Sequence, residues 1–120
     1  MTSYVIVTPA FNEADYIGKT INSVLGQTIR PLIWLIVDDG SEDDTAKVIQ
    51  QYATDYKWIQ YMYRTKESGQ SYYVSNVHAI MAGYEQVKAV NYDFLAVLDA
   101  DISLPKNYYE QIFNLSLIHI

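Results

Sequence analysis

Residues 32–41, L-I-W-L-I-V-D-D-G-S, place a run of apolar side chains directly before two aspartates, a glycine and a serine. A run of this length that follows Pro31 and stops at turn residues predicts a buried strand over Leu32–Asp38. Ser41 is predicted to cap the next helix, because the three acidic residues after it suit the positive end of a helix dipole. A strand followed at once by a helix is the repeating unit of a parallel α/β sheet.

The same unit recurs along the chain. Strands are also predicted over Tyr4–Thr8, Trp58–Tyr63 and Phe94–Leu98, and helices over Ala14–Gln27, from Glu42 to Tyr56, over Tyr73–Val87 and from Leu104 onward. Short apolar strands that alternate with helices predict a Rossmann-like α/β fold. We therefore expect a single domain over residues 1–120, with a mostly parallel sheet of about four strands and helices on both faces.

Composition narrows the class of partner. The chain has 120 residues, of which 50% are hydrophobic, no cysteine and a formal net charge of −6. The absence of cysteine excludes disulfides and thiolate metal sites. The negative charge disfavours nucleic acid and anionic membranes as partners, yet acidic sites bind polyphosphates through a divalent cation. No apolar run approaches the ~20 residues of a membrane helix. We expect a cytoplasmic chain, and attachment to a membrane through sequence not present here stays open.

Polar clusters follow three of the predicted strands. They are Pro9–Glu13, Asp38–Ser41 and Asp99–Ser103. In open α/β sheets ligands bind outside the carboxyl ends of the strands. The three clusters are therefore predicted to converge on one edge of the sheet and to form the binding site.

The segment Asp99-Ala100-Asp101 is the candidate metal site. Its two carboxylates flank one small residue and can point the same way from an extended backbone. Hard oxygen ligands suit Mg²⁺ or Mn²⁺, which would bridge to a diphosphate. The alternative is a solvated loop with two acids, and the position after an apolar strand favours the metal site.

The other two clusters have functional and structural interpretations. The adjacent carboxylates of Asp38 and Asp39 repel each other without a ligand or cation, which favours a functional role for the pair. Gly40 and Ser41 are interpreted as turn and cap residues. Phe11 offers a flat face for a nucleobase, a contact worth ~1–3 kcal/mol, although it could equally belong to the core.

Taken together, the clusters and their spacing resemble the GT-A glycosyltransferases of family 2 over nearly the whole chain. The matching stretches are V-I-V-T-P-A-F-N-E-A-D-Y-I (5–17), S-V-L-G-Q-T (23–28), L-I-V-D-D-G-S-E-D-D-T (35–45) and F-L-A-V-L-D-A-D-I-S-L-P (94–105). The last stretch also resembles polyprenyl-phosphate sugar transferases such as the dolichol-phosphate mannosyl transferases. The chain departs from these patterns at Phe11, where the family usually has tyrosine, and at Ser103, where those transferases have glutamine.

The resemblance implies an inverting glycosyltransferase that binds a UDP- or GDP-linked sugar through Mg²⁺ or Mn²⁺ and transfers the sugar to an acceptor. The nucleotide-sugar site that it implies consists of Pro9, Phe11, Glu13, Val37, Asp39, Asp99, Ala100 and Asp101. Within that set, Asp39 would contact the base and slightly favours uracil. Asp101 would coordinate the metal. Asp99 would assist in the metal site and lie near the ribose or a metal-bound water.

The resemblance also implies what this chain lacks. Family members carry the catalytic base after the segment that corresponds to Asp99–Asp101, so we expect a chain truncated at its C-terminus that binds nucleotide weakly and transfers no sugar. An exposed apolar sheet edge would favour homo-oligomers. The rival interpretation is a non-catalytic nucleotide-binding or interaction module of the same fold. Arg64 and Lys66 could reach a diphosphate, although solvated loop charges are the simpler interpretation.

Overall fold

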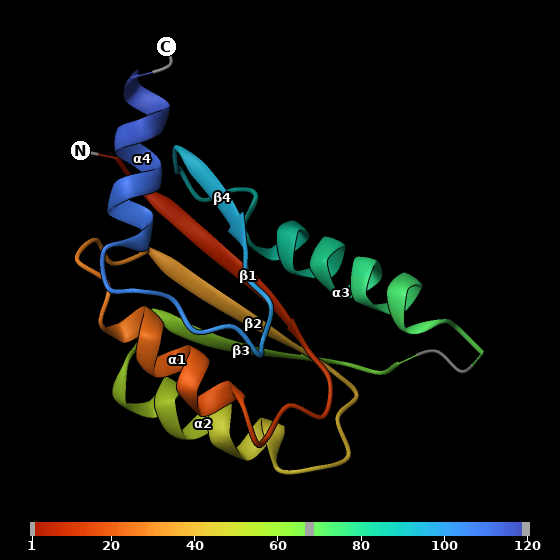
Figure 1. Ribbon diagram of the computed structural model, residues 1–120. Coiled ribbons are helices and arrows are strands. Elements are labelled where there is room, and N and C mark those ends of the chain that lie inside the picture. The colour runs from red at the N-terminus through yellow and green to blue at the C-terminus, as the bar shows by residue number, and fades with distance from the viewer. Residues whose placement is uncertain (1, 67–68, 119–120) are drawn as a thin grey trace.

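The computed structural model describes residues 2–66 and 69–118, which form an open sheet of parallel strands with helices on both faces (Figure 1). The sheet has the strand order β3-β2-β1-β4. Its strands are β1 (Tyr4–Ala10), β2 (Ile33–Asp39), β3 (Ile59–Arg64) and β4 (Phe94–Val97). The helices are α1 (Ile17–Leu25), α2 (Thr45–Asp55), α3 (Tyr72–Val87) and α4 (Tyr108–Ile118). The predicted fold class and element order are confirmed.

The two central strands are buried on both faces, which explains why they read as continuous apolar runs. Even-numbered residues such as Ile6 and Trp34 pack under α1, α2 and α4, in a core that also contains Tyr109 and Phe113. Odd-numbered residues of the same strands face α3 on the other side. The alternation of side chains along each strand therefore divides the apolar residues between two cores.

Helix α3 approaches the sheet closely because its buried face carries small residues. Ser75, Ala79, Gly83 and Val87 recur every four residues and are buried. A Cβ atom added to Gly83 would lie 2.5 Å from Cγ1 of Val7. This close contact fixes α3 over β1 and β2, and with it the residues at the start of the helix.

The predicted helix starts are wrong by a few residues. Helix α2 begins at Thr45, and its N-cap position is Asp44 rather than Ser41. The Ser41 hydroxyl instead accepts a hydrogen bond from the Asn12 amide, and the Ser41 amide donates to Asp38. The Ser41 hydroxyl, which the local sequence pattern predicted to cap α2, is thus used in a tertiary contact with Asn12. Helix α1 likewise begins at Ile17 rather than at residue 14.

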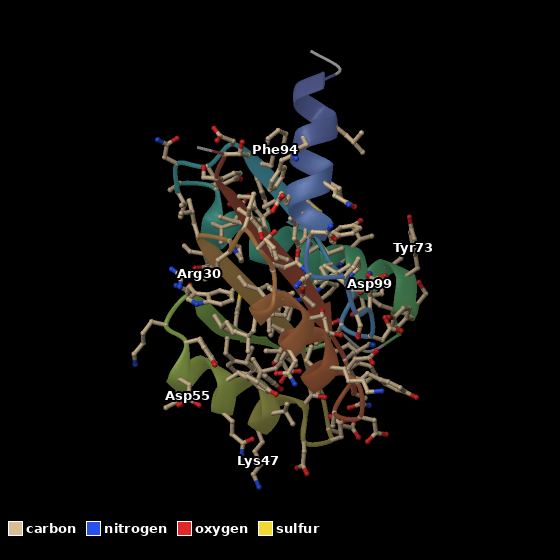
Figure 2. The ribbon with its side chains drawn as sticks, turned by 60° about the vertical axis from the view of Figure 1, so that its left-hand side comes forward. Arg30, Lys47, Asp55, Tyr73, Phe94 and Asp99 are labelled. Carbon is tan, nitrogen blue, oxygen red and sulfur yellow. The ribbon has the colours of Figure 1, made fainter. Side chains whose placement is uncertain are left out.

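Strand β4 lies at an edge of the sheet and is much more exposed than β1 and β2. The exposed fractions are 42% for Phe94, 37% for Leu95 and 49% for Val97. An apolar groove of about 230 Å³ lies between β4 and α4. Figure 2 shows Phe94 beside α4, with Asp99 in the segment that leaves β4 at its other end. In the part of the chain that the structure describes, no helix is both long and apolar enough to span a bilayer.

Candidate functional site

The loops after β1 and β2 are joined by side-chain hydrogen bonds. Asn12 adopts a left-handed backbone conformation with φ 52°. Its amide donates to the Ser41 hydroxyl over 2.9 Å, and its side-chain oxygen accepts from the Glu42 amide over 2.8 Å. The Glu13 amide donates to the Thr45 hydroxyl over 2.8 Å. The first two polar clusters therefore meet at the carboxyl edge of the sheet, as the sequence predicted.

The segment after β4 is fastened to α1. The Thr20 hydroxyl of α1 donates a hydrogen bond to the carbonyl of Ala100 over 2.9 Å, and both residues are buried. Asp99 and Asp101, on either side of this anchor, are exposed. A buried middle residue with a fixed carbonyl therefore leaves the flanking carboxylates open to solvent and to a ligand.

The carboxylates of the first and third clusters act on one another. Partial burial, followed by the negative charges of Asp101, Asp43 and Asp99, raises the pKa of Glu13. Burial and the charges of Glu13, Asp99 and Asp101 likewise raise the pKa of the Tyr72 phenol at the start of α3. All three strand ends and α3 thus border one region of negative potential, which a cation would relieve.

The carboxylates of Asp99 and Asp101 fit a divalent cation whose remaining ligands come from a bound phosphate and water. Among residues 2–66 and 69–118, no three Asp, Glu, His or Cys side chains converge into a complete metal-binding group. Mg²⁺ is usually held by one or two carboxylates, with phosphates and waters supplying the other oxygens. Asp99 and Asp101 match this number of protein carboxylates, because both offer hard oxygen ligands and neither is buried.

The two aspartates that end β2 have partners within the protein itself. The buried Asp39 carboxylate pairs with Arg64 Nη1 at 2.6 Å and also accepts a hydrogen bond from the Ser75 hydroxyl of α3. Asp38 accepts from the Tyr61 hydroxyl over 2.7 Å and from the Ser41 amide over 3.0 Å. The repulsion expected between these carboxylates is therefore offset by donors from β3, α3 and the turn, and it does not by itself require a ligand.

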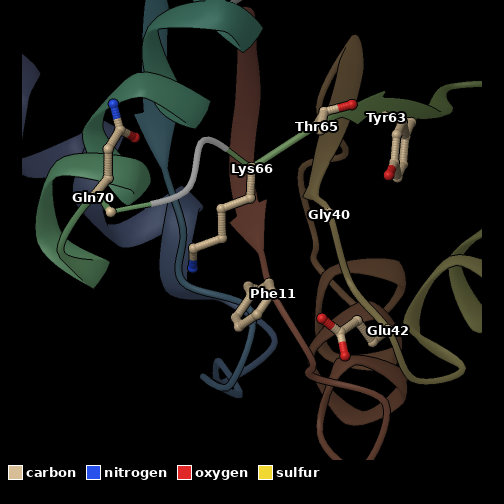
Figure 3. A pocket seen from close by; sticks show the side chains of 8 residues that line it. Phe11, Gly40, Glu42, Tyr63, Thr65, Lys66 and Gln70 are labelled. Atoms are coloured by element: carbon tan, nitrogen blue, oxygen red, sulfur yellow. The ribbon is translucent and has the colours of Figure 1, made fainter.

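A pocket of about 320 Å³ opens beside this network (Figure 3). Phe11 forms one wall, and its ring is half-buried. The Lys66 ammonium lies 3.6 Å from the centroid of the Phe11 ring and 5.8 Å from that of Tyr72. The other lining residues are Gly40, Glu42, Tyr63, Thr65, Gly69 and Gln70. Phe11 thus belongs to a pocket wall, and neither hydrophobic core includes it.

The residues predicted for the site fall into two groups. Phe11, Glu13, Asp99 and Asp101 lie at the carboxyl edge with at least part of the side chain accessible. The others are buried: Pro9 and Val37, which are paired in register between β1 and β2, together with Asp39 and Ala100. The Val37 side chain faces α3, where a Cβ on Gly83 would lie 3.0 Å from its Cγ2.

The sequence pattern did not predict the partners of the β2 aspartates, which are Tyr61, Arg64 and Ser75, or the contact of Lys66 with Phe11. Their sequence signal is weak. Tyr61 and Arg64 lie in β3, whose pairing with β2 places them beside Asp38 and Asp39. Ser75 reaches Asp39 because α3 docks on the sheet.

Comparisons with known proteins agree with this architecture. The family described as Glycosyl transferase family 2 matches residues 5–116. Glycosyltransferase AglE of Haloferax volcanii is 32% identical over 88% of this chain, and TuaG of Bacillus subtilis is 31% identical over 88%. This chain spans only 33% of AglE and 38% of TuaG.

Solved structures share the fold. A crystal structure of S. aureus TarS 1–349 in complex with UDP superposes with a TM-score of 0.70 at 20% identity, covering 94% of this chain and 31% of that one. The mannosyltransferase PcManGT of Pyrobaculum calidifontis, in complex with GDP-Man and Mn²⁺, superposes with a TM-score of 0.64 at 19% identity. The match covers 85% of this chain and 28% of that one. With the family match over nearly its whole length, the chain belongs to glycosyl transferase family 2.

Proposed function

We propose that this chain is the donor-binding part of a glycosyltransferase that takes a sugar from a nucleoside diphosphate with the help of a divalent cation. The observation that carries the proposal is the meeting of Glu13, Asp99 and Asp101 in one negative region next to the Phe11 pocket. Tyr72 connects the two, because its pKa responds to all three carboxylates and its ring lies near Lys66.

Asp101 and Asp99 would hold Mg²⁺ or Mn²⁺, and the bound cation would supply Lewis-acid stabilisation of the leaving diphosphate. The exposure of both carboxylates and the hydrogen bond that fixes Ala100 between them support this assignment. The complex of PcManGT with GDP-Man and Mn²⁺, a protein of the same fold, also supports it.

Phe11 would stack on the nucleobase, with Glu13 and the ends of β1 and β2 completing the nucleoside pocket. The predicted contact between Asp39 and the base remains a proposal. Both Asp39 oxygens already accept a hydrogen bond, so a base would share the carboxylate with Arg64 and Ser75. Solved relatives of the fold hold UDP, UDP-GlcNAc or GDP-Man, and we propose a UDP- or GDP-linked sugar as the donor.

The acceptor and the catalytic base are assigned to no residue of this chain. The carboxylates of Asp38 and Asp39 are engaged within the protein, and those of Glu13, Asp99 and Asp101 belong to the proposed donor site. We propose that these 120 residues bind donor nucleotide without transferring sugar.

Calorimetric titration of UDP and GDP, with and without Mn²⁺, tests the proposal. We expect binding that requires Mn²⁺ and that is lost in Asp101→Ala, because the exposed carboxylate would coordinate the ion. Asp55→Ala, which removes an exposed carboxylate at the end of α2, is the matched control and should bind like the wild type. Equal binding by wild type and Asp101→Ala would remove Asp101 from the metal site. A folded chain that binds neither nucleotide would refute donor binding by these residues.

A further inference from the structure

Lys66 rests on aromatic rings instead of pairing with a carboxylate. Its ammonium lies 3.6 Å from the centre of the Phe11 ring and 5.8 Å from that of Tyr72. Within residues 2–66 and 69–118, the recorded ion pairs are Arg64 with Asp39 and Lys88 with Glu85, so Lys66 forms none. The neighbouring cation, Arg64, is committed to Asp39, which leaves Lys66 as a pocket-lining cation that is not held by an acid.

The backbone of Lys66 is fixed by close contact with the loop after β2. Gly40 has φ 77°, and a Cβ added there would lie 3.0 Å from the Lys66 amide nitrogen and 3.1 Å from its Cβ. The start of the side chain is therefore anchored while its end reaches across the pocket towards Phe11 (Figure 3). Because the backbone is anchored and the four-carbon side chain is flexible, the ammonium can exchange partners without movement of the strand.

The resting position of the ammonium conflicts with base stacking. An ammonium centred 3.6 Å from the ring occupies the space that a stacked base would take on that face of Phe11. A cation held only by ring faces is bound weakly, whereas a diphosphate offers several anionic oxygens. The diphosphate would also need added positive charge near Glu13, Asp99 and Asp101, because burial and the neighbouring carboxylates together raise the pKa of Glu13.

We propose that Lys66 covers the Phe11 ring in the free protein and moves onto the donor diphosphate when the base stacks on that ring. Lys66 is then a binding residue that distinguishes a nucleoside diphosphate from a bare nucleoside. A nucleoside must displace the ammonium and offers it no new partner, while a diphosphate provides one. This inference rests on the proposed donor binding.

The test is the affinity of UDP and of uridine, with GDP and guanosine in parallel, for wild type and Lys66→Met in one Mg²⁺ buffer. The variant keeps a long apolar stem and removes the charge. We expect uridine to bind about two- to fivefold more tightly, because no cation must leave the ring. We expect UDP to bind about ten- to thirtyfold more weakly, because a charge-assisted contact is lost. Opposite changes for the two ligands are the signature of the exchange.

Two further variants secure the interpretation. Lys66→Arg keeps a cation that can both cover the ring and meet the diphosphate, so its ratio of UDP to uridine affinity should stay within about threefold of the wild type. Lys47→Met removes an exposed lysine of α2 and should change neither affinity. Thermal unfolding and circular dichroism of each variant confirm that it is folded.

Changes of the same sign for UDP and uridine in Lys66→Met, or no change in either, would overturn the role of Lys66 while leaving donor binding intact. A wild-type chain that binds neither UDP nor GDP would instead refute the proposed function, and the inference with it. The two failures are therefore distinguishable within one set of titrations.

Discussion

Asp39 shows how much one residue depends on partners far away in sequence. The residue is 3% exposed, and its carboxylate is held by Arg64 from β3 and by Ser75 from α3. A buried carboxylate is costly unless its charge is paired and its oxygens accept hydrogen bonds. The network therefore fastens the end of β2 to a neighbouring strand and to the helix above it, at the border of the proposed donor pocket.

Replacement of Arg64 by leucine is expected to destabilise the fold. The change leaves Asp39 buried with only the Ser75 hydroxyl as a partner, and breaking a buried pair in this way costs about 3–5 kcal/mol in the free energy of unfolding. Urea denaturation followed by circular dichroism measures the loss. The control, Lys88→Leu, breaks an exposed pair with Glu85 and should leave stability unchanged. Equal stability of wild type and Arg64→Leu would show that the pair contributes nothing.

At the scale of elements, helix α3 matters most for the site. Its small buried residues let it lie close to β1 and β2, and its first turns bring Tyr72 and Ser75 to the carboxyl edge of the sheet. The contact is tightest at Gly83. Because Gly83 has no side chain, α3 can lie this close to the sheet, and the residues at its start are positioned accordingly.

Gly83→Ala and Gly18→Ala are expected to change stability in opposite directions. At Gly83 the new methyl group would lie 2.5 Å from Cγ1 of Val7, so overpacking should cost about 1–3 kcal/mol despite the better helix propensity of alanine. At Gly18 in α1, the nearest atom to a new Cβ is the Tyr52 hydroxyl at 3.9 Å, so the propensity gain of up to about 1 kcal/mol should remain. Urea midpoints measure both, and a stabilised Gly83→Ala would show that α3 can shift away from the sheet without loss.

On the scale of the whole molecule, one edge of the sheet is incompletely covered. Among the strands that the structure describes, β4 pairs with β1 alone, and apolar side chains of β4 remain exposed beside the groove against α4. The chain spans about a third of the lengths of AglE and TuaG. An unpaired apolar edge can pair with another chain.

We predict that the isolated chain self-associates through β4 in a concentration-dependent manner. Val97→Lys places a charge on this strand at a side chain that is 49% exposed, so it should raise the monomer fraction without unfolding the protein. Sedimentation velocity over a range of concentrations measures the effect. Leu32→Lys, at an exposed site that precedes β2, is the control and should leave association unchanged. A wild-type chain that stays monomeric throughout would refute the prediction.

The sequence by itself determined the order of strands and helices, the parallel sheet and the meeting of polar clusters at its carboxyl edge. These features depend on local periodicity and on a topological rule that applies to every sheet of this class. Phe11, Glu13, Asp99 and Asp101 were placed correctly at that edge for the same reason, since each follows directly after a strand or its turn.

Only the tertiary structure decided how the site is arranged inside that frame. Ser41 binds Asn12 instead of capping α2, Asp39 is held by residues 25 and 36 positions further along the chain, and Lys66 covers Phe11. The first contact requires the pairing of β1 with β2, and the others require the pairing of β3 with β2 or the docking of α3 on the sheet. Local pattern carries no information about such pairings, because hydrogen bonds and ring contacts between distant residues depend on where packing brings them in space.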